Sequence, residues 1–121
     1  IDDMISSGGS MLDTARQLKQ MNARRVYICC TFGLFTDGLK AFDHAYEHGH
    51  FDKVITTNLT YLPPEIYTRP YFVEADMCKF MASIIDFMNH DVSLSNTTAT
   101  TEKIHNIVES YNSRREFVLN D

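Results

Sequence analysis

The chain opens with the sequence IDDMISSGGS at residues 1–10. A short apolar segment carries two adjacent acids, Asp2 and Asp3, a loop of small residues follows, and a helical pattern begins directly after the loop. In open α/β sheets, a loop that follows a strand in this way lies at the edge where ligands bind. These ten residues therefore indicate both a fold class and the place of a binding site.

The loop has the composition of an anion site. Gly8 and Gly9 allow a ligand to approach the main chain closely. Ser6, Ser7 and Ser10 supply hydroxyl donors. The first N–H groups of the following helix have no partner within the helix, and the helix dipole attracts an anion to them. We therefore expect a phosphate group at this loop, with Ser10 as the N-cap of the helix.

The two acids suit a different part of the ligand. Asp2 and Asp3 repel a phosphate because they are anionic, but they accept hydrogen bonds from sugar hydroxyls and bind hard cations such as Mg²⁺. The alternative is a solvated Gly/Ser turn between a strand and a helix, because such turns are common. The paired acids before the loop favour a site for a phosphorylated sugar.

Strand-like and helical patterns alternate along the rest of the chain. We expect strands at residues 1–5, 25–31, 53–58 and 71–73, helices at 10–22, 37–48, 75–89 and 101–115, and a loop at 62–64. Strands and helices that alternate at these lengths predict an α/β fold, with a parallel sheet and helices on both faces. The loops at residues 2–10, 31–37 and 57–61 would then share the carboxyl edge of the sheet.

Composition narrows the functional class. The 121 residues allow one domain at most, and a net charge of −5 argues against a general nucleic-acid surface. No apolar run reaches the ~18 residues of a membrane span, and no secretory signal is recognisable. Three cysteines without a spacing pattern indicate reduced thiols and a cytoplasmic protein. His44, His48 and His50 are interpreted as an exposed helix end rather than a metal site.

Residues 1–10 resemble the phosphoribosyl-diphosphate-binding motif of type I phosphoribosyltransferases and ribose-phosphate diphosphokinases. That motif consists of an apolar strand, two acids, a short loop, and Thr or Ser. Three later segments resemble the diphosphokinases in particular, at residues 23–27, 31–36 and 54–58. The resemblance covers about residues 1–95 and implies the C-terminal half of a diphosphokinase, with a type I phosphoribosyltransferase-like fold truncated at its N-terminus. Residues 96–121 are interpreted as a polar linker and a short helix.

The resemblance implies a role for each matching position. Asp2 and Asp3 would contact the ribose hydroxyls, directly or through Mg²⁺. The 5-phosphate of ribose 5-phosphate would be held by Ser6, Ser7, Gly8, Gly9 and Ser10. The whole enzyme would transfer diphosphate from ATP to ribose 5-phosphate, with ATP bound mainly by a missing N-terminal half. It would be a cytoplasmic homo-oligomer, and this part would hold no catalytic residue and be inactive alone.

Two positions depart from the family pattern. Ser6 stands where the family usually has an acid, and Phe32 stands where it has a histidine. These departures keep open a non-catalytic regulatory or assembly subunit of the same family. A type I phosphoribosyltransferase fragment, which would bind phosphoribosyl diphosphate as donor, is another alternative. Residues 31–36 and 54–58 favour the diphosphokinase.

Overall fold

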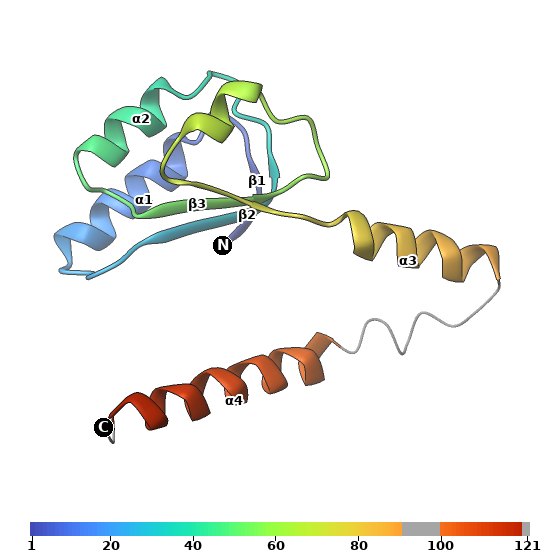
Figure 1. The fold of residues 1–121 in the computed structure, drawn as a ribbon. Coiled ribbons are helices and arrows are strands. Elements are labelled where there is room, and N and C mark those ends of the chain that lie inside the picture. The colour runs from blue at the N-terminus through green and yellow to red at the C-terminus, as the bar shows by residue number, and fades with distance from the viewer. Residues whose placement is uncertain (91–99, 120–121) are drawn as a thin grey trace. The chain divides into compact units, whose positions relative to one another are not determined.

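The computed structural model describes residues 1–90 and 100–119 (Figure 1). Its elements are, in chain order, β1 (Asp2–Ile5), α1 (Gly9–Gln20), β2 (Tyr27–Gly33), α2 (Lys40–Glu47), β3 (Lys53–Thr57), the 3₁₀ helix η1 (Pro64–Thr68), β4 (Phe72–Ala75), α3 (Cys78–Asn89) and α4 (Thr100–Leu119). The chain divides into two compact units, Ile1–Lys79 and Phe80–Asp121. Within the described ranges, no helix combines the length and the apolar character needed to cross a bilayer.

The four strands form one parallel sheet with the order β1-β2-β3-β4. Asp2 pairs with Cys30 at one edge, and Cys29, Ile55 and Val73 form a row across the other three strands. The expected α/β fold with a parallel sheet is therefore confirmed. All four carboxyl ends lie along one edge of this sheet, because the strands run in the same direction.

The helices of Ile1–Lys79 lie on one face of the sheet, where helices on both faces were expected. Figure 1 shows α1, α2 and η1 together above the strands. Each crossover leads to the next strand in the same direction across the sheet, and right-handed crossovers of this kind place every connecting helix on the same side. The strand order decides this arrangement, and hydrophobic periodicity carries no information about strand order.

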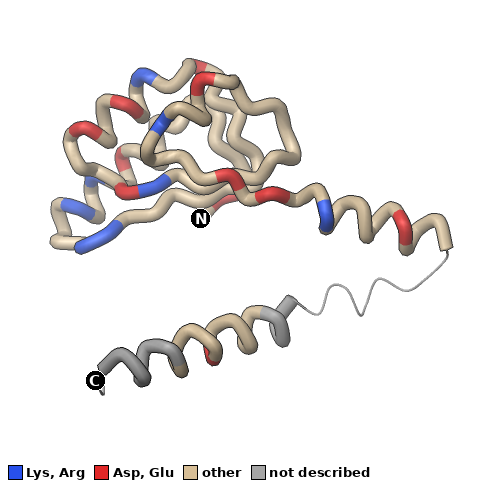
Figure 2. The backbone as a smooth tube through the Cα atoms, viewed as in Figure 1, with Lys and Arg blue, Asp and Glu red and all other residues tan. Residues whose placement is uncertain are grey.

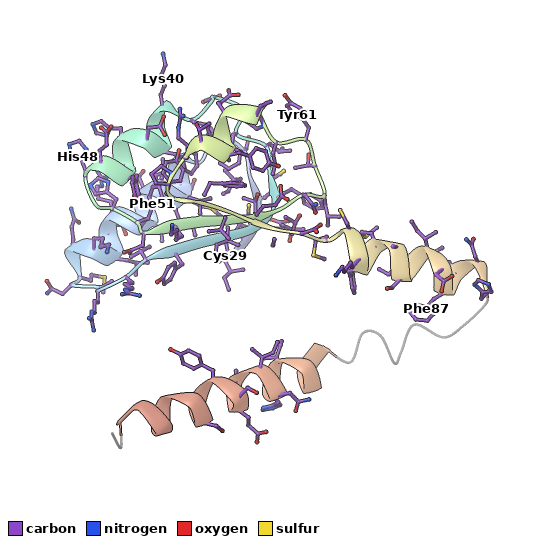
Figure 3. The ribbon with its side chains drawn as sticks, viewed as in Figure 1. Cys29, Lys40, His48, Phe51, Tyr61 and Phe87 are labelled. Atoms are coloured by element: carbon purple, nitrogen blue, oxygen red, sulfur yellow. The ribbon has the colours of Figure 1, made fainter. Side chains whose placement is uncertain are left out.

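The core fills the space between this sheet and its helices. Its largest fully buried side chains are Tyr71, Phe42, Phe51, Ile5, Ile66 and Val54. Figure 3 shows Phe51 on the helix side of the sheet and Cys29 on the opposite side. Ile66 explains why η1 forms next to the expected loop at residues 62–64: Pro64 begins the turn and Ile66 is fully buried beneath it.

The second unit contains most of α3 and the whole of α4. The apolar spacing that predicted a helix at residues 75–89 is realised in α3, which begins at Cys78. α4 extends over Thr100–Leu119, which is four residues beyond its expected end at 115. Residues 91–99 lie outside the described residues, so the linker and the division expected near residue 95 stay predictions.

Candidate functional site

The loop between β1 and α1 is shaped by a glycine. Gly8 has a φ of 87°, in the left-handed region that glycine adopts at low cost. It is the N-cap of α1, and no side chain caps the helix. The expectation that Ser10 caps the helix is therefore wrong, because α1 begins at Gly9 and Ser10 lies in its first turn. The Ser10 carbonyl accepts a hydrogen bond from the Thr14 hydroxyl at 2.9 Å.

Three backbone donors mark the start of α1. Leu12 N donates to the Gly8 carbonyl at 3.0 Å, which closes the first turn. The N–H groups of Gly9, Ser10 and Met11 precede this bond and have no acceptor within the helix. The positive end of the helix dipole lies at the same point. This end of α1 therefore offers an anion a set of aligned donors.

A cavity of about 160 Å³ lies against these donors. Its lining residues are Asp2, Met4, Ile5, Ser6, Ser7, Gly8, Gly9, Ser10 and Met11. The structure thus brings Asp2 and all five predicted loop residues together around one space. None of the lining residues is Lys or Arg. Figure 2 shows basic residues instead on α1 and in the turn from α1 to β2, so an anion in this cavity would be held by N–H and hydroxyl groups.

The two acids do not share this cavity. Asp2 lines it and Asp3 does not. Side chains alternate along β1, so those of Asp2 and Asp3 leave the strand on opposite faces. The Asp2 carboxylate also accepts a hydrogen bond from the Asp3 N–H at 2.8 Å.

This separation limits how a cation can bind. In the part of the chain that the structure describes, no group of three or more His, Cys, Asp or Glu residues is placed to hold a metal. Mg²⁺ usually keeps several waters and takes one or two carboxylates together with substrate oxygens. Asp2 fits that role as one carboxylate at the cavity, although the described residues do not form a complete set of protein ligands for the ion.

The loop after β2 is joined to the loop after β1. Leu34 N donates to the Ile5 carbonyl at 2.8 Å, and Thr36 N donates to the Ser6 carbonyl at 3.1 Å. The hydroxyls of Ser6 and Thr36 lie 3.5 Å apart. The proximity of these two loops was expected, but sequence reasoning gave Thr36 no role. The sequence offered one signal for Thr36: it is a polar residue in the loop at 31–37, which was predicted to lie at the carboxyl edge of the sheet.

Phe32 and Asn58 complete the carboxyl edge. Phe32 on β2 pairs with Met4 on β1 and is 39% exposed, so the two side chains form an exposed apolar surface. Asn58, after β3, accepts from Met77 N at 2.9 Å and donates to the Asp76 carboxylate at 2.9 Å. Asn58 therefore links the ends of β3 and β4 by hydrogen bonds within the protein.

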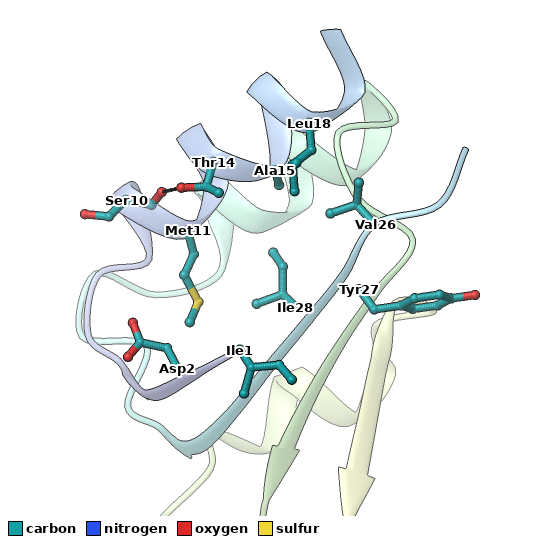
Figure 4. Close-up of a pocket in the computed structure, with 10 residues that line it drawn as sticks. All are labelled: Ile1, Asp2, Ser10, Met11, Thr14, Ala15, Leu18, Val26, Tyr27 and Ile28. Atoms are coloured by element: carbon teal, nitrogen blue, oxygen red, sulfur yellow. Dashed lines mark hydrogen bonds between the residues drawn. The ribbon is translucent and has the colours of Figure 1, made fainter. Parts of the chain in front are cut away.

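A second cavity, of about 230 Å³, lies between α1 and β2 (Figure 4). Asp2 and Met11 lie at the end nearest the start of α1, and Leu18 and Val26 at the other end. Most of its lining is apolar, including Ala15 and Ile28 of the buried core. It therefore suits an apolar group better than a sugar or a phosphate, and the smaller cavity is the candidate site.

Comparison with known proteins identifies similar sequences, although no family model matches the chain. The chain is 32% identical over 95 residues to a ribose-phosphate pyrophosphokinase of a Nostoc species, across 78% of this chain and 28% of the relative. It is 34% identical over 95 residues to the chloroplastic ribose-phosphate pyrophosphokinase 2 of rice, across 78% of this chain and 23% of the relative. The chain thus spans less than a third of these relatives.

The fold also has a counterpart among solved structures. The crystal structure of phosphoribosylpyrophosphate synthetase from Mycobacterium smegmatis matches with a TM-score of 0.63 and 21% identity, over 74% of this chain and 29% of that one. This likeness supports the fold. Together with the sequence relatives, it confirms the expected resemblance to ribose-phosphate diphosphokinases, for which pyrophosphokinase is another name.

Proposed function

We propose that this chain, which is similar to part of the ribose-phosphate pyrophosphokinases over 78% of its length, is one piece of such an enzyme and binds ribose 5-phosphate. One observation supports this proposal above the others. A cavity at the carboxyl edge of a parallel sheet gathers Asp2, the Ser6–Ser10 loop and the first turn of α1. It thus offers donors for a phosphate next to an acceptor for sugar hydroxyls.

In the proposed pose the two ends of the ligand meet different groups. The 5-phosphate faces the N–H groups of Gly9, Ser10 and Met11, with the loop hydroxyls as further donors. The ribose hydroxyls donate to the Asp2 carboxylate. Asp2 would also hold Mg²⁺ together with substrate oxygens, and the ion would supply the positive charge that the cavity lining lacks.

The whole enzyme would transfer diphosphate from ATP to O1 of ribose 5-phosphate. Transfer of this kind depends mainly on positioning the reactants and neutralising their charge. We assign the positioning of the acceptor sugar to this chain, as the C-terminal half of the enzyme. We assign ATP binding and the remaining metal contacts to the rest of the protein. We also propose that the whole enzyme is a cytoplasmic homo-oligomer.

The 121-residue chain is expected to bind ribose 5-phosphate but not to turn it over. Binding requires the cavity, whereas transfer also requires an ATP site that we place outside this chain. Calorimetry with ribose 5-phosphate and Mg²⁺ measures the first, and AMP formation from ATP measures the second. A folded chain that releases no binding heat would contradict the sugar site. Sustained AMP formation would contradict the assignment of ATP binding to another part.

Asp2 and Asp3 are expected to differ in their contribution to binding. Asp2→Asn removes the charge of an acceptor that lines the cavity, and because hydrogen bonds to charged groups contribute about 1.5–3 kcal/mol, affinity should fall about tenfold. Asp3→Asn is the matched control next to it and should change affinity less than about twofold. Titration of both variants with ribose 5-phosphate tests the difference. Equal losses would show that Asp2 makes no contact with the ligand that Asp3 lacks.

A non-catalytic assembly subunit is the second candidate. The apolar pair of Phe32 and Met4, and the Ser6 hydroxyl beside Thr36, stand where the family pattern has a histidine and an acid. Full-length protein that folds but fails to bind ribose 5-phosphate would favour this reading. The relatives described above are pyrophosphokinases, so we prefer that family to a phosphoribosyltransferase.

A further inference from the structure

The conformation of the phosphate loop depends on a residue of α2. A Cβ atom placed on Gly8 would lie 2.2 Å from Cζ and 2.5 Å from Cε2 of Phe42. Both distances are far below van der Waals contact, so the Gly8 backbone rests directly on the edge of this ring. Phe42 is 34 residues away in sequence and is not among the residues that line the cavity.

The Phe42 ring is held in place by its own neighbours. It is fully buried and makes edge-to-face contacts with Phe35, at 5.2 Å between centroids, and with Phe51, at 6.4 Å. Phe35 has a φ of 48°, which is costly for an aromatic residue and persists only where the surroundings impose it. The Phe42 ring therefore has a fixed position beneath Gly8, whereas most residues of the loop at 6–10 are exposed to solvent.

We propose that Phe42 is a positioning residue for the phosphate site: its ring supports the left-handed turn at Gly8 and so aims the N–H groups of Gly9, Ser10 and Met11 into the cavity. This inference rests on the proposed function for the identity of the ligand. Position 8 requires a glycine for two reasons. Its φ lies in the left-handed region, and the Phe42 ring leaves no space for a Cβ atom there. A smaller side chain at position 42 would let the turn relax toward the core and would misalign the donors.

The test compares two core substitutions in the 121-residue chain. Phe42→Leu removes the ring beneath Gly8, and Ile66→Ala removes the same number of carbon atoms from a fully buried side chain of η1. Both create a core cavity and should lower the thermal midpoint alike. Only Phe42→Leu should shift the amide resonances of Gly8 to Met11 in the unliganded protein. It should also weaken ribose 5-phosphate binding about tenfold, whereas Ile66→Ala should change affinity less than about twofold.

The outcomes separate this inference from the proposed function. If both variants shift the loop amides equally, or weaken binding equally, Phe42 has only a structural role and the inference is overturned. If the wild-type chain binds neither ribose 5-phosphate nor inorganic phosphate, the proposed function fails. A selective shift of the Gly8–Met11 amides in Phe42→Leu would then still establish the positioning.

A second pair of variants covers the case in which Phe42→Leu does not fold. Asn tolerates positive φ better than most residues, so Gly8→Asn and Gly38→Asn impose comparable backbone demands. A Cβ at Gly38 meets nothing within 4 Å, whereas a Cβ at Gly8 meets Phe42. Gly8→Asn should therefore displace the loop amides and weaken binding at least about tenfold, with Gly38→Asn close to wild type. Equal behaviour of the two variants would overturn the inference.

Discussion

Replacing Gly9 by valine is expected to abolish binding of ribose 5-phosphate while leaving the four-stranded sheet folded. Gly9 is the first residue of α1 and lines the candidate cavity. A Cβ at this position meets only the Ser7 hydroxyl, at 4.0 Å, so the new side chain fits without displacing protein atoms. It occupies the space in front of the helix donors instead, where we place the phosphate.

The expected loss of affinity is large because several bonds fail together. Hydrogen bonds to a charged group contribute about 1.5–3 kcal/mol each, so the loss of two or more lowers affinity at least about 100-fold. Stability should change little, since a β-branched residue costs a helix less than about 1 kcal/mol. Calorimetry gives the first quantity and thermal unfolding followed by circular dichroism gives the second.

Gly9→Ala is the matched control for this substitution. One methyl group fills less of the cavity, so its loss of affinity should fall between those of the wild type and Gly9→Val. If the Gly9→Val protein folds and its affinity for ribose 5-phosphate is unchanged, the phosphate does not bind at this loop. Because Gly8→Ala collides with Phe42, that variant would not distinguish a blocked ligand from a distorted loop.

Local pattern was enough to predict the four strands and the parallel sheet. Five of the seven residues predicted as a strand at 25–31 lie in β2, and the pattern at 53–58 agrees with β3 to within a residue. The face on which the helices lie could not be predicted, since it follows from strand order. η1 was missed because five residues are too few to show a helical period, and its buried Ile66 is not recognisable as buried from local sequence.

The site was predictable in composition and less so in geometry. The loop residues that gather at the cavity are consecutive in sequence, so their proximity follows from chain connectivity. The opposite orientation of Asp2 and Asp3 was also within reach, because side chains alternate along a strand. The contact of Gly8 with Phe42 was not, since it joins residues 34 positions apart. That contact also explains why a glycine, and not Ser10, is the N-cap of α1.

Asp43→Ala is expected to destabilise the fold strongly, because the Asp43 carboxylate accepts three hydrogen bonds. Asp43, on α2, accepts two hydrogen bonds from Arg69, at 2.8 and 2.9 Å, and one from the Tyr71 hydroxyl, at 2.7 Å. These bonds join α2 to the segment between η1 and β4. Tyr71 is 1% exposed, so removal of the carboxylate leaves a buried hydroxyl without its acceptor.

The free energy of unfolding should fall by about 2–3 kcal/mol, because a buried polar group that loses its partner retains the full cost of desolvation. Asp13→Ala is the matched control, since it removes an aspartate that pairs with Arg16 on α1 at 3.0 Å. That pair is exposed, with 53% and 66% of the two side chains accessible, so its loss should cost less than about 0.5 kcal/mol. Urea unfolding at neutral pH measures both, and similar losses would show that the Asp43 bonds do not stabilise the fold.

The same network predicts how stability depends on pH. Burial acts to raise the pKa of Asp43, but the hydrogen bonds from Arg69 and Tyr71 outweigh it and hold the pKa below the ordinary value of 3.8. A carboxyl group with a lowered pKa in the folded state stabilises the protein fully above its unfolded pKa, and the contribution is lost as the pH falls through the folded value. The difference in unfolding free energy between wild type and Asp43→Ala should therefore be constant from neutral pH to about pH 5 and shrink below about pH 4. A difference that grows on acidification would mean that the carboxylate is not the favoured form in the folded state.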